Sequence, residues 1–207
     1  MTGLLVVFPL LVQGVTKTVM LWLSSLVIGL SIGCIWGIVR CDRLRIPVLS
    51  TTLDALTFAL RGIPFFVQLL IAYFVFPELI NINVSAMAAA IGSLGLCSAA
   101  YVSNIVRGGM NAIPSGQWEA ARVLGFSQWA TARYIIIPQA LNVVLPALTG
   151  EGDHLLKSTA MISTIGVLEL TGAAKNIIAR ELNPISMYLT IAVMYLLLSS
   201  LLAKFSS

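Results

Sequence analysis

Four ionisable side chains lie close together in an otherwise apolar part of the sequence: Glu151, Asp153, His154 and Lys157. Carboxylates beside a histidine could ligate a metal, but the chain has a single histidine and no second ligand follows at metal-type spacing. No nucleophile with a base and an orienting partner accompanies them, so we do not expect catalysis. The remaining chemistry is recognition: Lys157 can pair with a carboxylate, and Ser158 and Thr159 can add hydrogen-bond donors.

The composition around this group is typical of a membrane protein. The chain has 207 residues, of which 58% are hydrophobic and 10% charged, whereas a soluble domain carries about 25% charged residues. At about 20 residues per span, roughly five helices could cross a membrane. The apolar runs are continuous rather than alternating, which favours helices over a barrel. A lysine at membrane depth can bind a substrate carboxylate, extend its ammonium group to the membrane surface, or pair with a nearby acid, here Glu151 or Asp153. The sequence leaves these three alternatives open for Lys157.

The basic residues predict an orientation. With the N-terminus outside, eight fall on the inner side: Arg40, Arg43, Arg45, Arg61, Arg107, Arg122, Arg133 and Lys204. Four fall on the outer side or near the polar group: Lys17, Lys157, Lys175 and Arg180. This bias predicts an outer N-terminus and a cytoplasmic C-terminus. The formal net charge of +4 is therefore topological rather than a sign of nucleic-acid binding.

The apolar runs give approximate spans: Val15–Val39, Phe65–Phe76, Val84–Val106, a fourth from within Tyr134–Leu141 to Gly150, and Ile185–Ala203. Residues 1–13 are too short to span, and Ser158–Leu170 is expected to be a half-helix or re-entrant piece. The four-residue spacing of Gly29, Gly33 and Gly37 predicts close helix packing. Three cysteines (Cys34, Cys41 and Cys97) are expected to be packing residues. Neither a cleaved signal peptide nor a regulatory tail after Lys204 is expected.

A polar stretch from Pro114 to Pro138 predicts two short helices with a sharp corner between them. Ser115 can cap the first helix, and Gly125 lies where a helix ends in a left-handed residue. Ser127 can cap the second helix, which Pro138 kinks or ends. Such a pair either rests on the membrane surface or docks a soluble partner.

This stretch resembles the EAA signature of permease subunits of ABC importers. Glu119, Ala120 and Ala121 are followed after three residues by Gly125, and later by Pro138. The usual pattern ends in Leu-Pro, whereas this chain has Ile137 before the proline. The resemblance implies a coupling segment at about residues 108–138 that inserts into a groove on a cytoplasmic ATPase.

Two further motifs resemble the histidine, glutamine and arginine permeases of this family. Tyr101-Val-Ser-Asn104-Ile-Val-Arg-Gly-Gly carries Asn104 where relatives often have glutamate, which argues against a cationic substrate. Asn104 could equally bond a neighbouring helix. The Leu-Leu-Lys157-Ser158-Thr159-Ala run is also similar to the family pattern, which implies that it lines the transport path. Gln68, in a weaker match, is a further candidate.

The resemblance therefore predicts an all-α membrane protein with about five helices, of the type I ABC importer permease fold, forming one domain over residues 1–207. It implies a bacterial inner-membrane subunit that imports a polar amino acid with cytoplasmic ATPase subunits, a second permease subunit and an extracytoplasmic binding protein. The sequence has no Gly-x-x-x-x-Gly-Lys-(Ser/Thr) loop, so ATP and magnesium are expected on the ATPase partner. An ion-driven carrier or channel, and a membrane scaffold without transport, are the alternatives.

Overall fold

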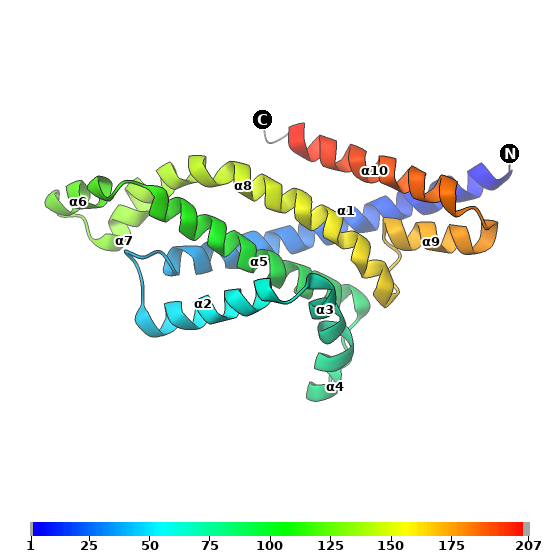
Figure 1. The fold of residues 1–207 in the computed structure, drawn as a ribbon, viewed down its shortest axis with the longest axis horizontal. Coiled ribbons are helices and arrows are strands. Elements are labelled where there is room, and N and C mark those ends of the chain that lie inside the picture. Colours follow the sequence, from blue (N-terminus) through cyan, green and yellow to red (C-terminus); the bar gives the residue numbers. More distant parts are fainter. Residues whose placement is uncertain (1, 205–207) are drawn as a thin grey trace. The chain divides into compact units, whose positions relative to one another are not determined.

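The computed structural model describes residues 2–204, and side chains from residue 8 to 204. Every regular element in this range is helical (Figure 1). The α-helices are α1 (Thr2–Val39), α2 (Pro47–Gly62), α3 (Phe65–Leu70), α4 (Phe76–Ile80), α5 (Ala86–Ala112), α6 (Ser115–Val123), α7 (Gln128–Thr131), α8 (Ile137–Ser158), α9 (Leu170–Glu181) and α10 (Pro184–Lys204). Two π-helical segments, η1 (Ile71–Val75) and η2 (Ala132–Ile136), and the 3₁₀ helix η3 (Thr159–Ile165) join some of them.

Four helical stretches are long and apolar enough to cross a membrane: Phe8–Val39, Ala86–Ala112, Gln128–Ile165 and Pro184–Lys204. A fifth arises if Pro47–Gly62 and Phe65–Ile80 form one broken span. The predicted all-helical membrane fold with about five spans is therefore confirmed. The predicted orientation of the termini stays a prediction, and residues 205–207, which concern the C-terminal tail, lie outside the described residues.

Two predicted boundaries are wrong. The first helix begins at Thr2 rather than near Val15. The fourth helix does not stop near Gly150 but runs to Ser158 and continues as η3, so Ser158–Leu170 is not a separate half-helix. Two polar bonds of this region form within the helix: Ser158 donates to the carbonyl of His154, and Lys157 pairs with Asp153, in each case one turn earlier. The helical path ends at Gly166, which has a φ of +83°.

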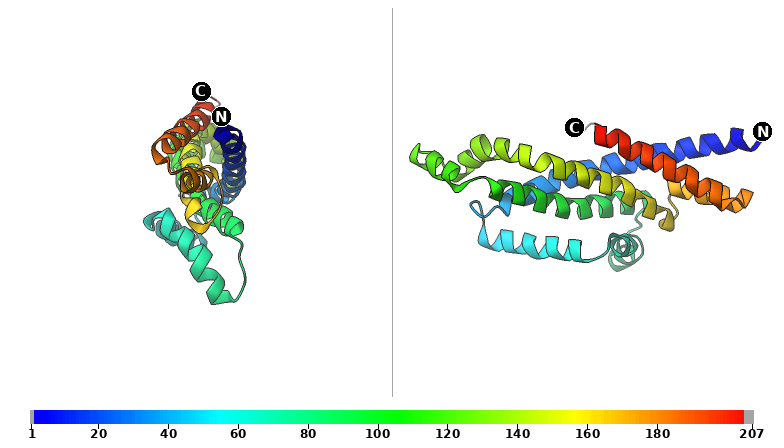
Figure 2. Two further views of the ribbon diagram at one scale, coloured as in Figure 1. Left: turned by 90° about the vertical axis from the view of Figure 1, so that its right-hand side faces the viewer. Right: turned by 45° about the horizontal axis from the view of Figure 1, so that its top comes forward.

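Contacts divide the chain into two compact units. Unit 1 combines residues 1–27, 64–95 and 152–207, and its described part holds two apolar clusters. One cluster includes Leu21, Leu69 and Leu94, while the other joins α9 to α10, which lie side by side in both views of Figure 2. Glu169 is fully buried at the start of α9.

Glu169 holds the start of α9 by accepting three hydrogen bonds. The amides of Thr171 and Gly172 each donate to its carboxylate at 2.8 Å, and the Tyr195 hydroxyl donates from α10 at 3.0 Å. This is N-terminal capping by a carboxylate. Burial is the largest influence on this carboxyl and raises its pKa above the ordinary value.

Unit 2 comprises residues 28–63 and 96–151. Its glycines let two helices approach closely, as their spacing predicts. A Cβ built on Gly33 would lie 2.6 Å from the Cβ of Val102, and one on Gly37 would lie 2.6 Å from the Cβ of Val106. The stripe is thus occupied by contacts within this subunit. The prediction of a single permease domain is not tested by this division and stays a prediction.

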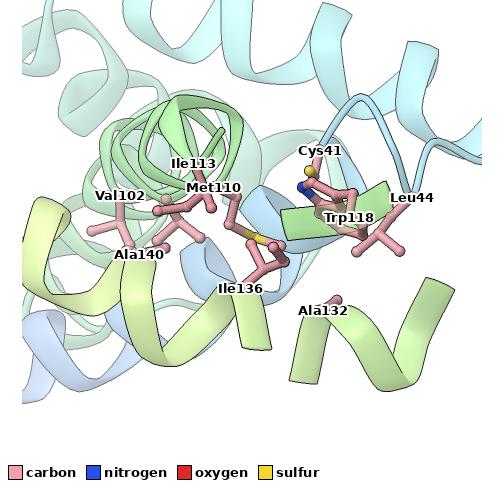
Figure 3. Packing of buried hydrophobic residues seen from close by; sticks show 10 residues of the cluster. Cys41, Leu44, Val102, Met110, Ile113, Trp118, Ala132, Ile136 and Ala140 are labelled. Atoms are coloured by element: carbon pink, nitrogen blue, oxygen red, sulfur yellow. The ribbon is translucent and has the colours of Figure 1, made fainter. Parts of the chain in front are cut away.

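The core of unit 2 gathers buried side chains from α5, α6, the α1–α2 loop, η2 and the start of α8 (Figure 3). Figure 3 shows Trp118 beside Cys41 and Leu44, and Met110 beside Ile136. Cys41 is fully buried, and desolvation raises the pKa of its thiol. This core anchors the α6–α7 segment to the rest of the unit.

Candidate docking element and transport path

The corner between α6 and α7 has a defined hydrogen-bond geometry. Gly125 has a φ of +83°, its amide donates to the carbonyl of Arg122 at 3.0 Å, and the amide of Phe126 donates to the carbonyl of Ala121 at 3.0 Å. These two bonds are the Schellman pattern that closes a helix at a left-handed residue. The predicted left-handed glycine is confirmed, and glycine takes this conformation at little cost.

The start of α7 is also as predicted. The amide of Ala130 donates to the Ser127 hydroxyl oxygen at 3.2 Å, and the Thr131 hydroxyl donates to the carbonyl of Ser127 at 2.9 Å. Side-chain capping of this kind satisfies an amide that the helix leaves free.

The predicted cap at Ser115 is wrong, and so is one of the two predicted effects of Pro138. The N-cap of α6 is Pro114, no side-chain cap bond is formed there, and Ser115 is already the first helical residue. Pro114 itself fixes the turn, since its carbonyl accepts from the amide of Gln117. Pro138 does not end the second helix, which passes through η2 into α8, so of the two predicted effects of this proline the kink stays a prediction. Pro138 lies inside this continuous helical path, two residues after the end of the wider π turn of η2, and an irregular turn of this kind is where a helix accommodates a residue without an N–H.

The two faces of α6 differ. Trp118 is buried in the core of unit 2 (Figure 3), and Ala121 is also buried, whereas Glu119 and Ala120 are exposed. The tip is apolar and open, with Val123 88% and Leu124 74% exposed. The element is therefore anchored on one side and presents apolar surface on the other. Both predicted readings, a membrane-surface helix pair and a docking element, need such a surface.

A cluster of charges holds the α1–α2 loop beside this element. Asp54 of α2 accepts from Arg40 Nε at 2.7 Å, from Arg45 Nη2 at 2.6 Å and from Arg107 Nη1 at 3.1 Å. Arg40 is buried and also donates to the Ser103 hydroxyl at 2.7 Å. Arg107 reaches Asp42 at 3.1 Å. Three arginines from the end of α1, the loop and α5 thus converge on one carboxylate.

Sequence reasoning missed this cluster because it treated the arginines as markers of topology. The signal was Asp54 itself, a lone carboxylate on a mildly amphipathic segment shortly after three arginines. A charge in that position is stable only when it is paired.

The predicted path residues of unit 1 are not equally exposed. The side chain of Lys157 is 59% exposed and pairs with Asp153 Oδ2 at 2.5 Å, one turn earlier. This is the pairing that the sequence left open. Ser158 and Thr159 are buried, and the Thr159 hydroxyl donates to the carbonyl of Leu156. Gln68 is half-buried on α3.

The other two predicted path residues lie in unit 2. Tyr101 and Asn104 are half-buried on α5, and the guanidinium carbon of Arg61 lies 5.4 Å from the centroid of the Tyr101 ring. No group of three or more metal-ligating side chains occurs in the part of the chain that the structure describes.

The fold and the helix corner define a transporter permease. The structure resembles a chain of "Crystal structure of an amino acid ABC transporter with histidines", with a TM-score of 0.88 and 32% identity, over 96% of this chain and 92% of that one. Residues 25–205 match the family described as "Binding-protein-dependent transport system inner membrane component", and the chain belongs to this family.

Relatives cover nearly the whole chain. It is 36% identical over 200 residues to "Probable amino-acid ABC transporter permease protein YckA" of Bacillus subtilis, covering 97% of this chain and 87% of the relative. It is 34% identical over 198 residues to "Glutamine transport system permease protein GlnP" of Escherichia coli K12, covering 94% and 89%. The predicted family and the inner-membrane location are thereby confirmed.

Proposed function

We propose that the chain is the membrane-spanning subunit of an ATP-driven importer of a polar amino acid, and that α6 and α7 dock it onto a separate ATPase. The observation that carries the proposal is the glycine corner at Gly125. It joins an anchored helix to a tip whose Val123 and Leu124 are almost fully exposed. Apolar side chains at such exposure are costly in water and stabilising in a partner's groove.

The residues of the EAA signature are proposed to have different roles in docking. Ala121 is buried and keeps α6 close to the core of unit 2, while Glu119 and Ala120 are exposed toward the partner. Gly125 sets the corner, and Pro138 lies in the helix that carries movement of the corner into the membrane. In this proposal ATP and magnesium bind to the separate ATPase subunits rather than to this chain.

The path for the substrate is proposed to pass the polar residues on α8, α5 and α3. Lys157 would exchange its bond to Asp153 for the carboxylate of the amino acid, since the pair is partly exposed. Exposed ion pairs of this kind are worth about 0–1 kcal/mol, so the exchange is not opposed by a strong competitor. Ser158, Thr159, Asn104, Tyr101 and Gln68 would supply neutral polar contacts along the path.

Transport would then follow an alternating cycle with the N-terminus outside and the C-terminus in the cytoplasm. An extracytoplasmic binding protein delivers the amino acid, and two permease subunits, identical or sister chains, form the pathway. Closure of two ATPase subunits on ATP moves the α6–α7 corners and switches access from one side to the other.

The test uses a matched pair of exposed leucines. Leu124→Ser removes apolar surface from the docking tip, and Leu182→Ser removes it from the end of α9, where Leu182 is 83% exposed. The tagged full-length chain is purified in mild detergent, and the co-purifying ATPase subunit is quantified. We expect stoichiometric ATPase with the wild type and with Leu182→Ser, and loss of most of it with Leu124→Ser. A chain that purifies alone and still transports on an ion gradient would overturn the proposal in favour of a secondary carrier.

A further inference from the structure

A cavity of about 350 Å³ lies beside the α6–α7 corner, entirely within unit 2. Its lining includes Arg43 from the α1–α2 loop and Arg122 from α6, but no aspartate or glutamate. Two buried side chains, Trp118 and Thr131, also line it. A cavity with two cationic side chains and no acid is suited to a negatively charged group.

The other arginines of unit 2 already have a partner. Three form ion pairs with aspartates and two lie over tyrosine rings, namely Arg40, Arg45 and Arg107, and Arg61 and Arg133. Among the described residues, Arg43 and Arg122 alone of the unit's arginines have neither kind of contact. Both residues are exposed, so a second protein can reach them.

The acids closest in sequence do not neutralise these two arginines. Glu119 lies one turn before Arg122, but it does not line the cavity and forms no ion pair in the described part of the chain. Asp42, directly before Arg43, is paired with Arg107. The cavity therefore carries two positive charges that this chain leaves without a counter-charge.

The backbone around the cavity is held in place before any partner arrives. The amide of Asp42 donates to Asn111 Oδ1 at 3.2 Å, and Leu44, on the other side of Arg43, is buried in the core. Helix α6, which carries the second arginine, is anchored by the buried Trp118. A negatively charged group could thus bind without first ordering the loop or the helix.

The neighbourhood of the docking tip identifies the source of the negative charge. Arg122 directly precedes the exposed tip residues Val123 and Leu124, and Phe126, two residues after the tip, also lines the cavity. A groove that covers the tip must therefore reach the rim of the cavity. An arginine enclosed by a partner without a counter-charge is costly, so this partner should supply an acid here.

We infer that the ATPase subunit presents an aspartate or glutamate side chain that enters this cavity and pairs with Arg43 and Arg122. The inference rests on the proposed docking of an ATPase at α6–α7. A carboxylate can accept hydrogen bonds from both guanidinium groups, whose planar geometry matches it. The tip then contributes apolar contact area, while the charged contact selects the correct partner and fixes its register.

The test measures the affinity of the co-purified ATPase subunit for the full-length permease in phosphatidylcholine nanodiscs, which contain no anionic lipid. Arg43→Gln/Arg122→Gln is compared with Lys175→Gln/Arg180→Gln, which removes two exposed cations from α9. We expect at least about tenfold weaker binding in the first variant, since a hydrogen bond to a charged group contributes roughly 10- to 150-fold. The α9 variant should bind as the wild type does.

A charge reversal identifies the acid on the ATPase. Arg122→Glu should weaken binding more than Arg122→Gln, because it places like charges opposite each other. Each exposed aspartate and glutamate of the ATPase subunit is then changed to arginine in turn. We expect one of these changes to restore the binding of Arg122→Glu at least tenfold and to weaken the binding of the wild-type permease.

Two results would overturn the inference and leave the proposed docking intact. One is equal ATPase affinity in the wild type and in both double variants, and the other is an ATPase series in which no change restores the binding of Arg122→Glu. A wild-type permease that binds no ATPase would refute the proposed function itself. Size-exclusion profiles establish that each variant is folded. If the double variant is not, Arg122→Gln alone changes an exposed residue and should still weaken binding severalfold.

Discussion

Replacing Gly125 provides a direct test of how the corner supports coupling. A Cβ added to Gly125 would meet no atom within 4 Å, so the cost of a substitution is purely that of its φ of +83°. For an L-residue the left-handed conformation costs about 1–2 kcal/mol. If the corner must keep this shape to dock, the ratio of docking-competent to other corner conformations falls about 5- to 30-fold for Gly125→Ala. Gly125→Val should lose more, and Gly125→Asn less, because asparagine tolerates this conformation.

Gly116→Ala is the control, because Gly116 also lies in the docking element and a Cβ there would meet no atom within 4 Å. Its backbone is helical, where alanine is favoured over glycine by about 1 kcal/mol, so the change should not weaken docking. The affinity of the purified ATPase subunit and the substrate-stimulated ATPase rate of the reconstituted complex are measured for each variant. Wild-type affinity in Gly125→Ala, or equal losses in Gly125→Asn and Gly125→Val, would refute the conformational argument.

Three further predictions concern other parts of the chain. Lys157→Met should raise the KM for import at least severalfold and leave ATPase binding unchanged, whereas Asp153→Asn should leave the KM unchanged. Uptake assays measure the KM, and an unaltered value in Lys157→Met would show that Lys157 does not line the path. Gly33→Ala should lower the free energy of unfolding by about 1–3 kcal/mol, because the new Cβ would lie 2.7 Å from the Ala99 carbonyl oxygen. A Cβ on Gly92 would meet no atom within 4 Å, so Gly92→Ala should leave stability unchanged. Melting temperatures of the two variants test this difference. Since the pKa of Glu169 is raised above its ordinary value of 4.5, the native state holds its proton longer, so stability falls as the pH rises from that value to the folded pKa and levels off above it. Glu169→Gln should not show this loss of stability with rising pH. If the stability of the wild type and of Glu169→Gln depended on pH in the same way, the prediction would be wrong.

The corner was predictable because its determinants are local. A left-handed glycine at Gly125 and a cap at Ser127 depend on a few neighbouring residues, and both are found. The same local reasoning failed at Ser115, where Pro114 one residue earlier takes the capping position. It also placed a break near Glu151, because polar residues in an apolar run suggest a loop. Lys157 and Asp153 instead pair along one helix face.

The charge cluster around Asp54 could not be derived from the sequence. Arg107 is 53 residues away along the chain, and its approach depends on how α5 packs in unit 2. The same holds for the cavity of about 350 Å³ that Arg43 and Arg122 help to line, because its lining comes from the α1–α2 loop and the α6–α7 corner. Sequence patterns identify the charged residues, and only tertiary packing decides which of them remain without a counter-charge.

The π-helical segment η2 constrains the length of the chain between α7 and α8. A π turn holds one residue more than an α turn, and each added residue rotates the downstream helix by about 100°. Ile136, the last residue of η2, and Ala140 and Val144, which follow it in α8, are all buried. A one-residue deletion within η2 would restore a regular helix. The buried residues that follow the deletion would then be rotated relative to α7 and would no longer face the core. Substitutions on the exposed side of η2, such as at Tyr134, leave the turn intact, so the fold here is more tolerant of changed residues than of a changed number of them.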